Sequence, residues 1–92
     1  MKTFLISYDL WWPEKSSAYE NLIKQIMSYW TRAKPLESFW FIKSIETTET
    51  IRNKLTPYLD TNDKIVVLDI TWDNRATKWL IKEITDWMNS NI

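Results

Sequence analysis

The chain has 92 residues, and its twelve Lys and Arg balance its twelve Asp and Glu, so the formal net charge is zero. This balance lacks the basic excess expected of a strong, general nucleic-acid binder. The absence of Cys, His and Gly excludes disulfides, thiolate nucleophiles, imidazole bases, the usual zinc sites and glycine-rich phosphate loops. Any catalysis would therefore depend on carboxylates, together with a hard divalent cation such as Mg²⁺ or Mn²⁺.

Size and hydrophobicity indicate one folded domain over residues 1–92. Hydrophobic residues make up 45% of the chain and aromatic residues 15%, which is typical of a globular domain. No apolar run reaches the ~18 residues of a membrane span, and the N-terminus has no signal-peptide pattern. We therefore expect a cytoplasmic protein that does not enter a membrane.

The first predicted element is a strand over residues 2–10. Phe4, Ile6 and Tyr8 alternate with Leu5, which sends apolar side chains to both faces of a sheet. Such a strand belongs in the interior of a layered domain. It ends at Asp9, which makes that end the first place to look for chemistry.

Residues 17–43 predict a helix and two strands. Ser17 and Glu20 have the spacing of a capping box, and the apolar residues that follow recur every three or four positions. Residues 32–36 fit a short edge strand because Pro35 is tolerated only at an edge. Residues 38–43 predict a strand with Phe39 and Phe41 on one face.

The second half of the chain repeats this pattern. A helix is expected to begin at Thr47 or Thr48 and to end near Pro57. Residues 64–71 predict a central or half-covered strand, apolar except at Asp69, and the spacing of apolar residues from Leu80 onward predicts a short C-terminal helix.

This order predicts an α+β fold, a ferredoxin-like βαββαβ antiparallel sheet with helices on one face and a C-terminal helical extension. The other face keeps apolar residues, which we assign as Leu5, Ile65 and Val67 together with one aromatic face of residues 38–43. That face needs a cover. The cover is either the same face of a second copy in a two-fold homodimer or the C-terminal segment of the chain itself.

The stretches FLISYDL, PLESFWFIK and PYLDTNDKIVVLDIT resemble the CRISPR-associated ferredoxin-fold nuclease-like family. That family contains the small dimeric partner of the CRISPR integrase and relatives outside CRISPR loci. The resemblance implies dimers formed through sheet faces and exchanged C-terminal segments, and a metal-dependent nuclease or nucleic-acid-binding role. It also implies that Asp9, matching an aspartate of the family, faces its symmetry mate and shares a divalent ion.

Asp9 and Asp69 each have two interpretations. A carboxylate is a hard oxygen donor, so Asp9 could be a catalytic metal ligand, or it could simply cap a loop amide at the strand end. Asp69 could lie beside Asp9 if the last strand neighbours the first. Alternatively, its charge could protect an edge strand against aggregation.

Four tryptophans lie near predicted loops, with basic residues close to them in the sequence. Exposed rings with neighbouring cations can stack on bases or anchor a protein interface. The alternative is that at least two of these rings fill the core or a dimer interface. The candidate contact residues are Trp11, Trp12, Lys15, Trp72, Arg75, Lys78 and Trp79.

The sequence therefore favours a dimeric protein that binds nucleic acid or a small nucleotide, with at most weak metal-dependent phosphodiester cleavage through Asp9. The alternative is a non-enzymatic interaction protein of a phage or mobile element, which would inhibit a host defence component or sequester a nucleotide signal. A third possibility is a structural dimer without a ligand.

Overall fold

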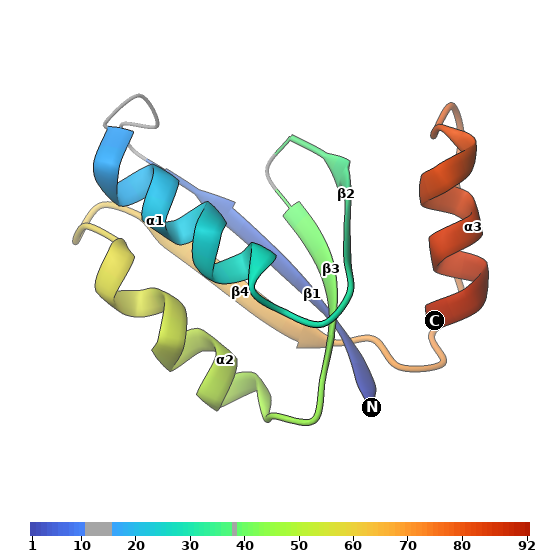
Figure 1. The fold of residues 1–92 in the computed structure, drawn as a ribbon, viewed down its shortest axis with the longest axis horizontal. Coiled ribbons are helices and arrows are strands. Elements are labelled where there is room, and N and C mark those ends of the chain that lie inside the picture. The colour runs from blue at the N-terminus through green and yellow to red at the C-terminus, as the bar shows by residue number, and fades with distance from the viewer. Residues whose placement is uncertain (11–15, 38) are drawn as a thin grey trace.

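A computed structural model describes residues 1–10, 16–37 and 39–92, and in these ranges the chain forms four β-strands and three α-helices (Figure 1). A short 3-10 turn at Thr56–Tyr58 follows the second helix. None of the helices in these ranges is long and apolar enough to cross a membrane. The elements are β1 Lys2–Asp9, α1 Ser16–Met27, β2 Arg32–Leu36, β3 Phe39–Ser44, α2 Thr48–Leu55, β4 Lys64–Asp69 and α3 Lys82–Asn91.

The strands form one antiparallel sheet in the order β2-β3-β1-β4. β1 lies in the interior between β3 and β4, as its apolar residues on both faces predict. β2 lies at one edge, where Pro35 is tolerated because an edge strand needs fewer ladder hydrogen bonds. The α+β prediction is confirmed, and the arrangement is compatible with a ferredoxin-like fold.

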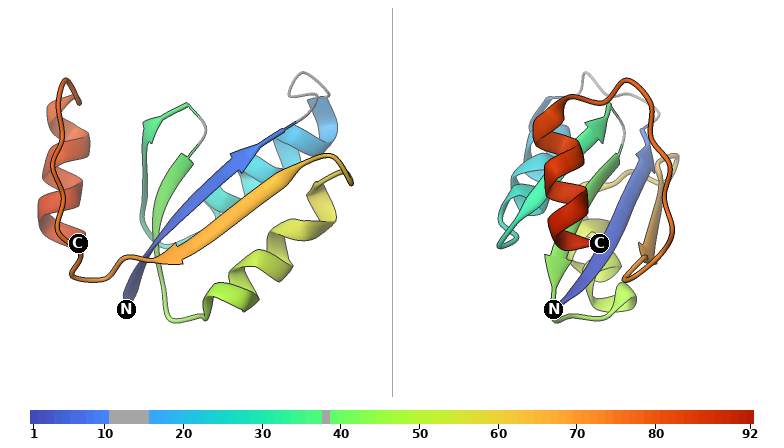
Figure 2. Two further views of the ribbon diagram at one scale, coloured as in Figure 1. Left: turned by 180° about the vertical axis from the view of Figure 1, so that it is seen from behind. Right: turned by 90° about the vertical axis from the view of Figure 1, so that its right-hand side faces the viewer.

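The main core lies between one face of the sheet and the helices α1 and α2, which pack side by side on that face (Figures 1 and 2). Alternate residues of β1 point into it, and each helix adds an apolar stripe with a spacing of four residues. Each fully buried aliphatic side chain contributes about 1.5–3 kcal/mol relative to an exposed one. The buried members are Phe4, Ile6, Tyr8, Leu22, Ile26, Trp40, Ile42, Ile51 and Leu55.

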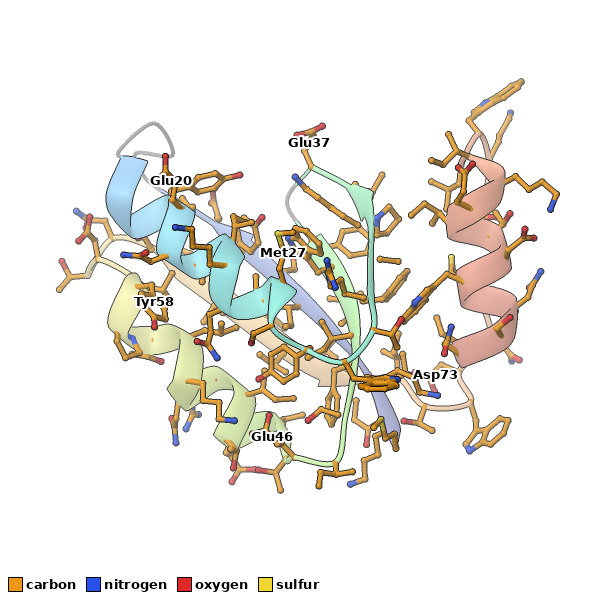
Figure 3. The ribbon with its side chains drawn as sticks, in the orientation of Figure 1. Glu20, Met27, Glu37, Glu46, Tyr58 and Asp73 are labelled. Atoms are coloured by element: carbon orange, nitrogen blue, oxygen red, sulfur yellow. The ribbon has the colours of Figure 1, made fainter. Side chains whose placement is uncertain are left out.

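Side-chain hydrogen bonds fix the start of α2. Thr47 is the N-cap, as predicted, and its Oγ1 accepts a hydrogen bond from the backbone N–H of Thr50 at 3.1 Å. Glu46 lies in the preceding turn (Figure 3). Its carboxylate accepts hydrogen bonds from Lys54 and from Ser44. The bond from Lys54 is the main cause that holds the pKa of Glu46 below its usual value. This network connects the end of β3 to the body of α2.

α3 covers part of the opposite face of the sheet. The Trp87 ring stacks on Phe41 with centroids 5.9 Å apart, and Met88 joins Phe41 and Ala33 in a second buried cluster. Trp87 Nε1 also donates a 2.8 Å hydrogen bond to Thr31 Oγ1. The C-terminal segment of the same chain is therefore one cover of this face.

The assignment of Ile65 and Val67 to this second face is wrong. The pairing of β1 with β4 sets Val67 opposite Ile6, on the face that α1 and α2 cover, and sets Leu68 opposite Leu5 on the second face. Residues directly opposite each other in a sheet share a face. The apolar residues that β4 presents on the second face are Val66 and Leu68, and both are about half exposed, at 51% and 50%.

A buried hydrogen bond connects β1 to β3 inside the main core. Trp40 Nε1 donates to the hydroxyl oxygen of Tyr8 at 3.2 Å. Burial is the main cause that raises the pKa of Tyr8 to about 12. The hydroxyl is therefore neutral at pH 7 and serves as the acceptor for the indole.

We expect Tyr8→Phe to lower the free energy of unfolding at neutral pH by about 1–3 kcal/mol, because the buried indole N–H loses its acceptor. The parent should also lose stability as the pH rises from about 10 to about 12, since the unfolded tyrosine ionises first. The variant should lack this part of the alkaline loss. Urea melts at neutral and alkaline pH measure both effects, with Tyr58→Phe as a half-buried control. An alkaline slope equal to that of the parent would contradict the assignment.

Candidate functional site

An apolar groove of about 400 Å³ lies between the second face of the sheet and the C-terminal part of the chain. Its floor contains Leu5, Phe39 and Phe41 from the two central strands. Its wall is the segment 73–80 together with α3 and the C-terminal residue. The full lining is Leu5, Pro35, Leu36, Phe39, Phe41, Ile70, Asp73, Asn74, Arg75, Ala76, Thr77, Lys78, Leu80, Met88 and Ile92.

The segment 70–81 leaves the end of β4, runs beside α3 and reaches the N-terminal end of that helix (Figure 2). Trp72 and Trp79 lie towards its two ends, with φ angles of 67° and 68°. Their exposed fractions are 86% and 89%. A left-handed backbone costs a bulky residue about 1–3 kcal/mol. The fold therefore holds two large rings in solvent at strained positions.

Two of the predicted contact residues, Arg75 and Lys78, line the groove. Arg75 Nη2 donates a 2.5 Å hydrogen bond to Asn89 Oδ1, which fastens the segment to α3. A guanidinium has five N–H donors, so this bond engages only part of its capacity. The ammonium of Lys78 lies 5.3 Å from the centre of the Trp79 ring, in a cation–π contact.

The polar side chains at the groove also include Asp73 and Asn74. Figure 3 shows Asp73 on the segment that leads from the sheet to α3. A second, more polar cavity of about 570 Å³ shares Asp73, Asn74 and Arg75 with the groove and adds Trp72 and Thr85. The segment therefore has open space on more than one side, and hydrogen-bonding groups border both cavities.

Asp9 does not lie at this groove. It sits opposite Lys64 at the end of β1 and lines a separate cavity of about 130 Å³ with Ser7 and Tyr8. Within residues 1–10, 16–37 and 39–92, no group of three or more Asp, Glu, His or Cys could hold a metal ion. In this part of the chain, Asp9 therefore has a cation opposite it and belongs to no metal-binding cluster.

The expectation that Asp69 lies beside Asp9 is wrong. β4 does neighbour β1, but the strands are antiparallel, so Asp69 pairs with Phe4 near the other end of the sheet. Its Oδ1 accepts hydrogen bonds from the backbone and side chain of Thr71, at 3.1 and 2.7 Å. These bonds hold the pKa of Asp69 below its usual value. The residue closes a turn at the end of an edge strand.

Three predicted contact residues, Trp11, Trp12 and Lys15, lie outside the described residues. Of the remaining four, Arg75 and Lys78 share the groove, Trp72 borders the second cavity, and Trp79 projects beside Lys78. Sequence reasoning missed the groove floor, because the pattern of residues 38–43 left open which of its two aromatic faces lies on the second face of the sheet. It also passed over Asp73 and Asn74, although their place in a polar loop between two tryptophans was a usable signal.

Comparisons of the chain with protein-family models, with curated proteins and with solved structures give no significant match. The resemblance to the CRISPR-associated family therefore remains a prediction from residue patterns. The chemistry of the groove is the basis for interpreting function.

We expect Trp87→Ala to release α3 and open the groove. The substitution removes the stack on Phe41 and the hydrogen bond to Thr31, which should cost about 3 kcal/mol. Thr31→Val is the matched control, since it removes only the hydrogen-bond acceptor and should cost about 1 kcal/mol. Amide hydrogen exchange should show faster exchange in α3 of the Trp87 variant while β1 stays protected. Unchanged protection of α3 would mean that other contacts hold the helix.

Proposed function

We propose that this chain is a homodimeric protein that binds a small nucleotide in the groove between the second sheet face and residues 73–80. The observation that carries the proposal is the combination of an apolar floor with two cationic side chains, Arg75 and Lys78, at one groove. The strand order β2-β3-β1-β4 supports assigning the fold to the ferredoxin-like class.

The floor suits a nucleobase. Pockets for small ligands are mostly apolar with a few placed polar groups, and a volume of about 400 Å³ is within their range. The ring of Phe39, which is partly exposed, provides aromatic surface, and such surface accepts any base. The carboxylate of Asp73 and the amide of Asn74 add acceptors and donors that can bind the edge of that base.

The two cations suit a phosphate. Arginine binds phosphate oxygens with paired N–H donors, whereas lysine offers a mobile point charge. Because the chain has no net charge, long-range attraction to a polynucleotide is weak, and a small nucleotide held by local contacts is the better fit. We therefore place nucleic acid second to a mononucleotide or dinucleotide as the ligand.

In this proposal the groove binds a nucleotide and does not cleave it. Asp9, the residue that the family resemblance implies as a catalytic ligand for Mg²⁺ or Mn²⁺, lines a different cavity. Holding a nucleotide without cleaving it is the behaviour of a protein that sequesters a nucleotide signal. This links the binding proposal to the alternative of a phage or mobile-element protein.

A second candidate function is direct binding of a host or phage protein. It is favoured by the exposure of Trp30, Trp72 and Trp79, which are 82%, 86% and 89% exposed. Tryptophan is enriched among the residues that dominate protein interfaces. Each exposed ring is then a candidate anchor for the contact.

The test is a calorimetric titration of the protein with AMP, GMP, ATP and a short oligothymidylate. We expect Arg75→Ala and Lys78→Ala each to weaken nucleotide binding by about 10-fold or more, since a hydrogen bond to a charged group contributes about 1.5–3 kcal/mol. Arg52→Ala and Lys24→Ala are matched controls: both residues are exposed, and they lie on α2 and α1 over the other sheet face. Asp9→Asn and added Mg²⁺ should leave affinity unchanged.

Binding that is lost equally in the controls, or absent in the parent for all four ligands, would overturn the proposal. Binding that requires Mg²⁺ and Asp9 would instead support the metal-dependent interpretation.

A further inference from the structure

The two edges of the sheet differ in how they are protected. β2 contains Pro35, and its pairing with β3 is interrupted by an irregularity between Ala33 and Leu36. α3 also packs against that strand. Prolines and bulges are two of the usual protections of an edge strand against pairing with another chain. The β2 edge has both.

The β4 edge has neither a proline nor a bulge, and its charged residues, Lys64 and Asp69, stand only at its two ends. All six residues, from Lys64 to Asp69, pair with β1 in an uninterrupted register. Figures 1 and 2 show β4 on the side of the sheet away from α3. On the second face of the sheet β4 presents Val66 and Leu68, which are 51% and 50% exposed. A regular apolar edge of this kind is a pairing surface.

We infer that β4 pairs with β4 of a second copy, antiparallel about a two-fold axis at Val67, so that two four-stranded sheets become one eight-stranded sheet. This inference concerns how the chain forms a dimer and does not depend on what the groove binds. It differs from a dimer made by stacking sheet faces, because the contact is a backbone ladder along one strand.

Self-complementarity of β4 favours a second copy over an unrelated peptide. With the axis at Val67, Val66 lies opposite the partner's Leu68 and Leu68 lies opposite the partner's Val66. Each pair joins two half-exposed apolar side chains on the same face. Val67 then lies opposite its own symmetry mate.

The neighbouring register is less favourable. An axis at Val66 would set Leu68 opposite the partner's Lys64 and would set Asp69 opposite the partner's Asp63, which opposes two like charges. The axis at Val67 therefore keeps both half-exposed residues in apolar pairs, whereas the axis at Val66 keeps only Val66 in such a pair and opposes two carboxylates. The zero net charge of the chain means that two copies do not repel each other at long range.

The test uses the absence of cysteine from the chain. In the proposed register a sulfur introduced by Val67→Cys faces its symmetry mate, with Cα atoms about 4.5–5.5 Å apart. That separation is within the range of a disulfide. We expect Val67→Cys to form a covalent dimer under mild oxidation at least 10 times faster than Thr61→Cys, which places the sulfur in the exposed turn before β4. Val66→Cys should crosslink more slowly than Val67→Cys.

A second variant covers the case in which Val67→Cys folds poorly by circular dichroism. Val66→Lys puts a charge into the centre of the contact and should convert the dimer to an 11.2 kDa monomer in light scattering, while Val66→Thr keeps it. The inference is overturned if Val67→Cys crosslinks no faster than Thr61→Cys, if Val66→Lys leaves the dimer intact, or if the parent is monomeric at all concentrations. Faster crosslinking at position 66 than at 67 would also overturn it.

Discussion

The constraint on which the structure depends is that β1 is apolar on both faces. Phe4 and Ile6 point to one side and Leu5 to the other, so neither face of the central strand can be left to water. α1 and α2 satisfy the first face with a continuous apolar layer. The second face depends on α3, a helix of ten residues that packs over β2 and β3. This helix covers only part of the second face, and both candidate surfaces lie where the cover is incomplete.

Incomplete cover creates both candidate surfaces. Where the segment 73–80 and α3 stand over the sheet, the space between them is the groove, with a floor of strand residues and a rim of loop residues. Where they do not reach, Val66 and Leu68 stay half exposed on β4. A ligand that fills the groove would bury apolar surface that the fold leaves accessible, and pairing along β4 would bury the remainder. Ligand binding in the groove and pairing along β4 would each bury part of the apolar surface that the second sheet face leaves exposed.

The sequence predicted the order and type of the elements because each has a local signal. Alternation gave the strands, the Thr47 cap and Pro57 bounded α2, and apolar spacing gave α3. Prediction from the sequence failed for the features that depend on pairing between strands far apart in the chain. The register between β1 and β4 decides which residues of β4 share a face with Ile6, so Ile65 and Val67 were placed on the wrong face. The antiparallel direction of the same pair separates Asp69 from Asp9. A register shift of one residue moves every side chain of a strand to the other face of the sheet, and no local sequence pattern encodes the register. The groove was missed for the same reason, since it joins loop residues to strands far from them in the sequence.

Two exposed tryptophans adopt a strained backbone conformation beside the groove. The chain lacks glycine, the residue that enters the left-handed region at the lowest cost. The backbone nevertheless adopts this region at two bulky residues, Trp72 and Trp79, towards the two ends of the segment that walls the groove. Rings that are 86% and 89% exposed gain little burial to offset this strain. Strained, exposed aromatic residues are therefore a cost in the isolated chain. Contact with a ligand or a partner would offset that cost. We therefore place the function at the segment between Trp72 and Trp79.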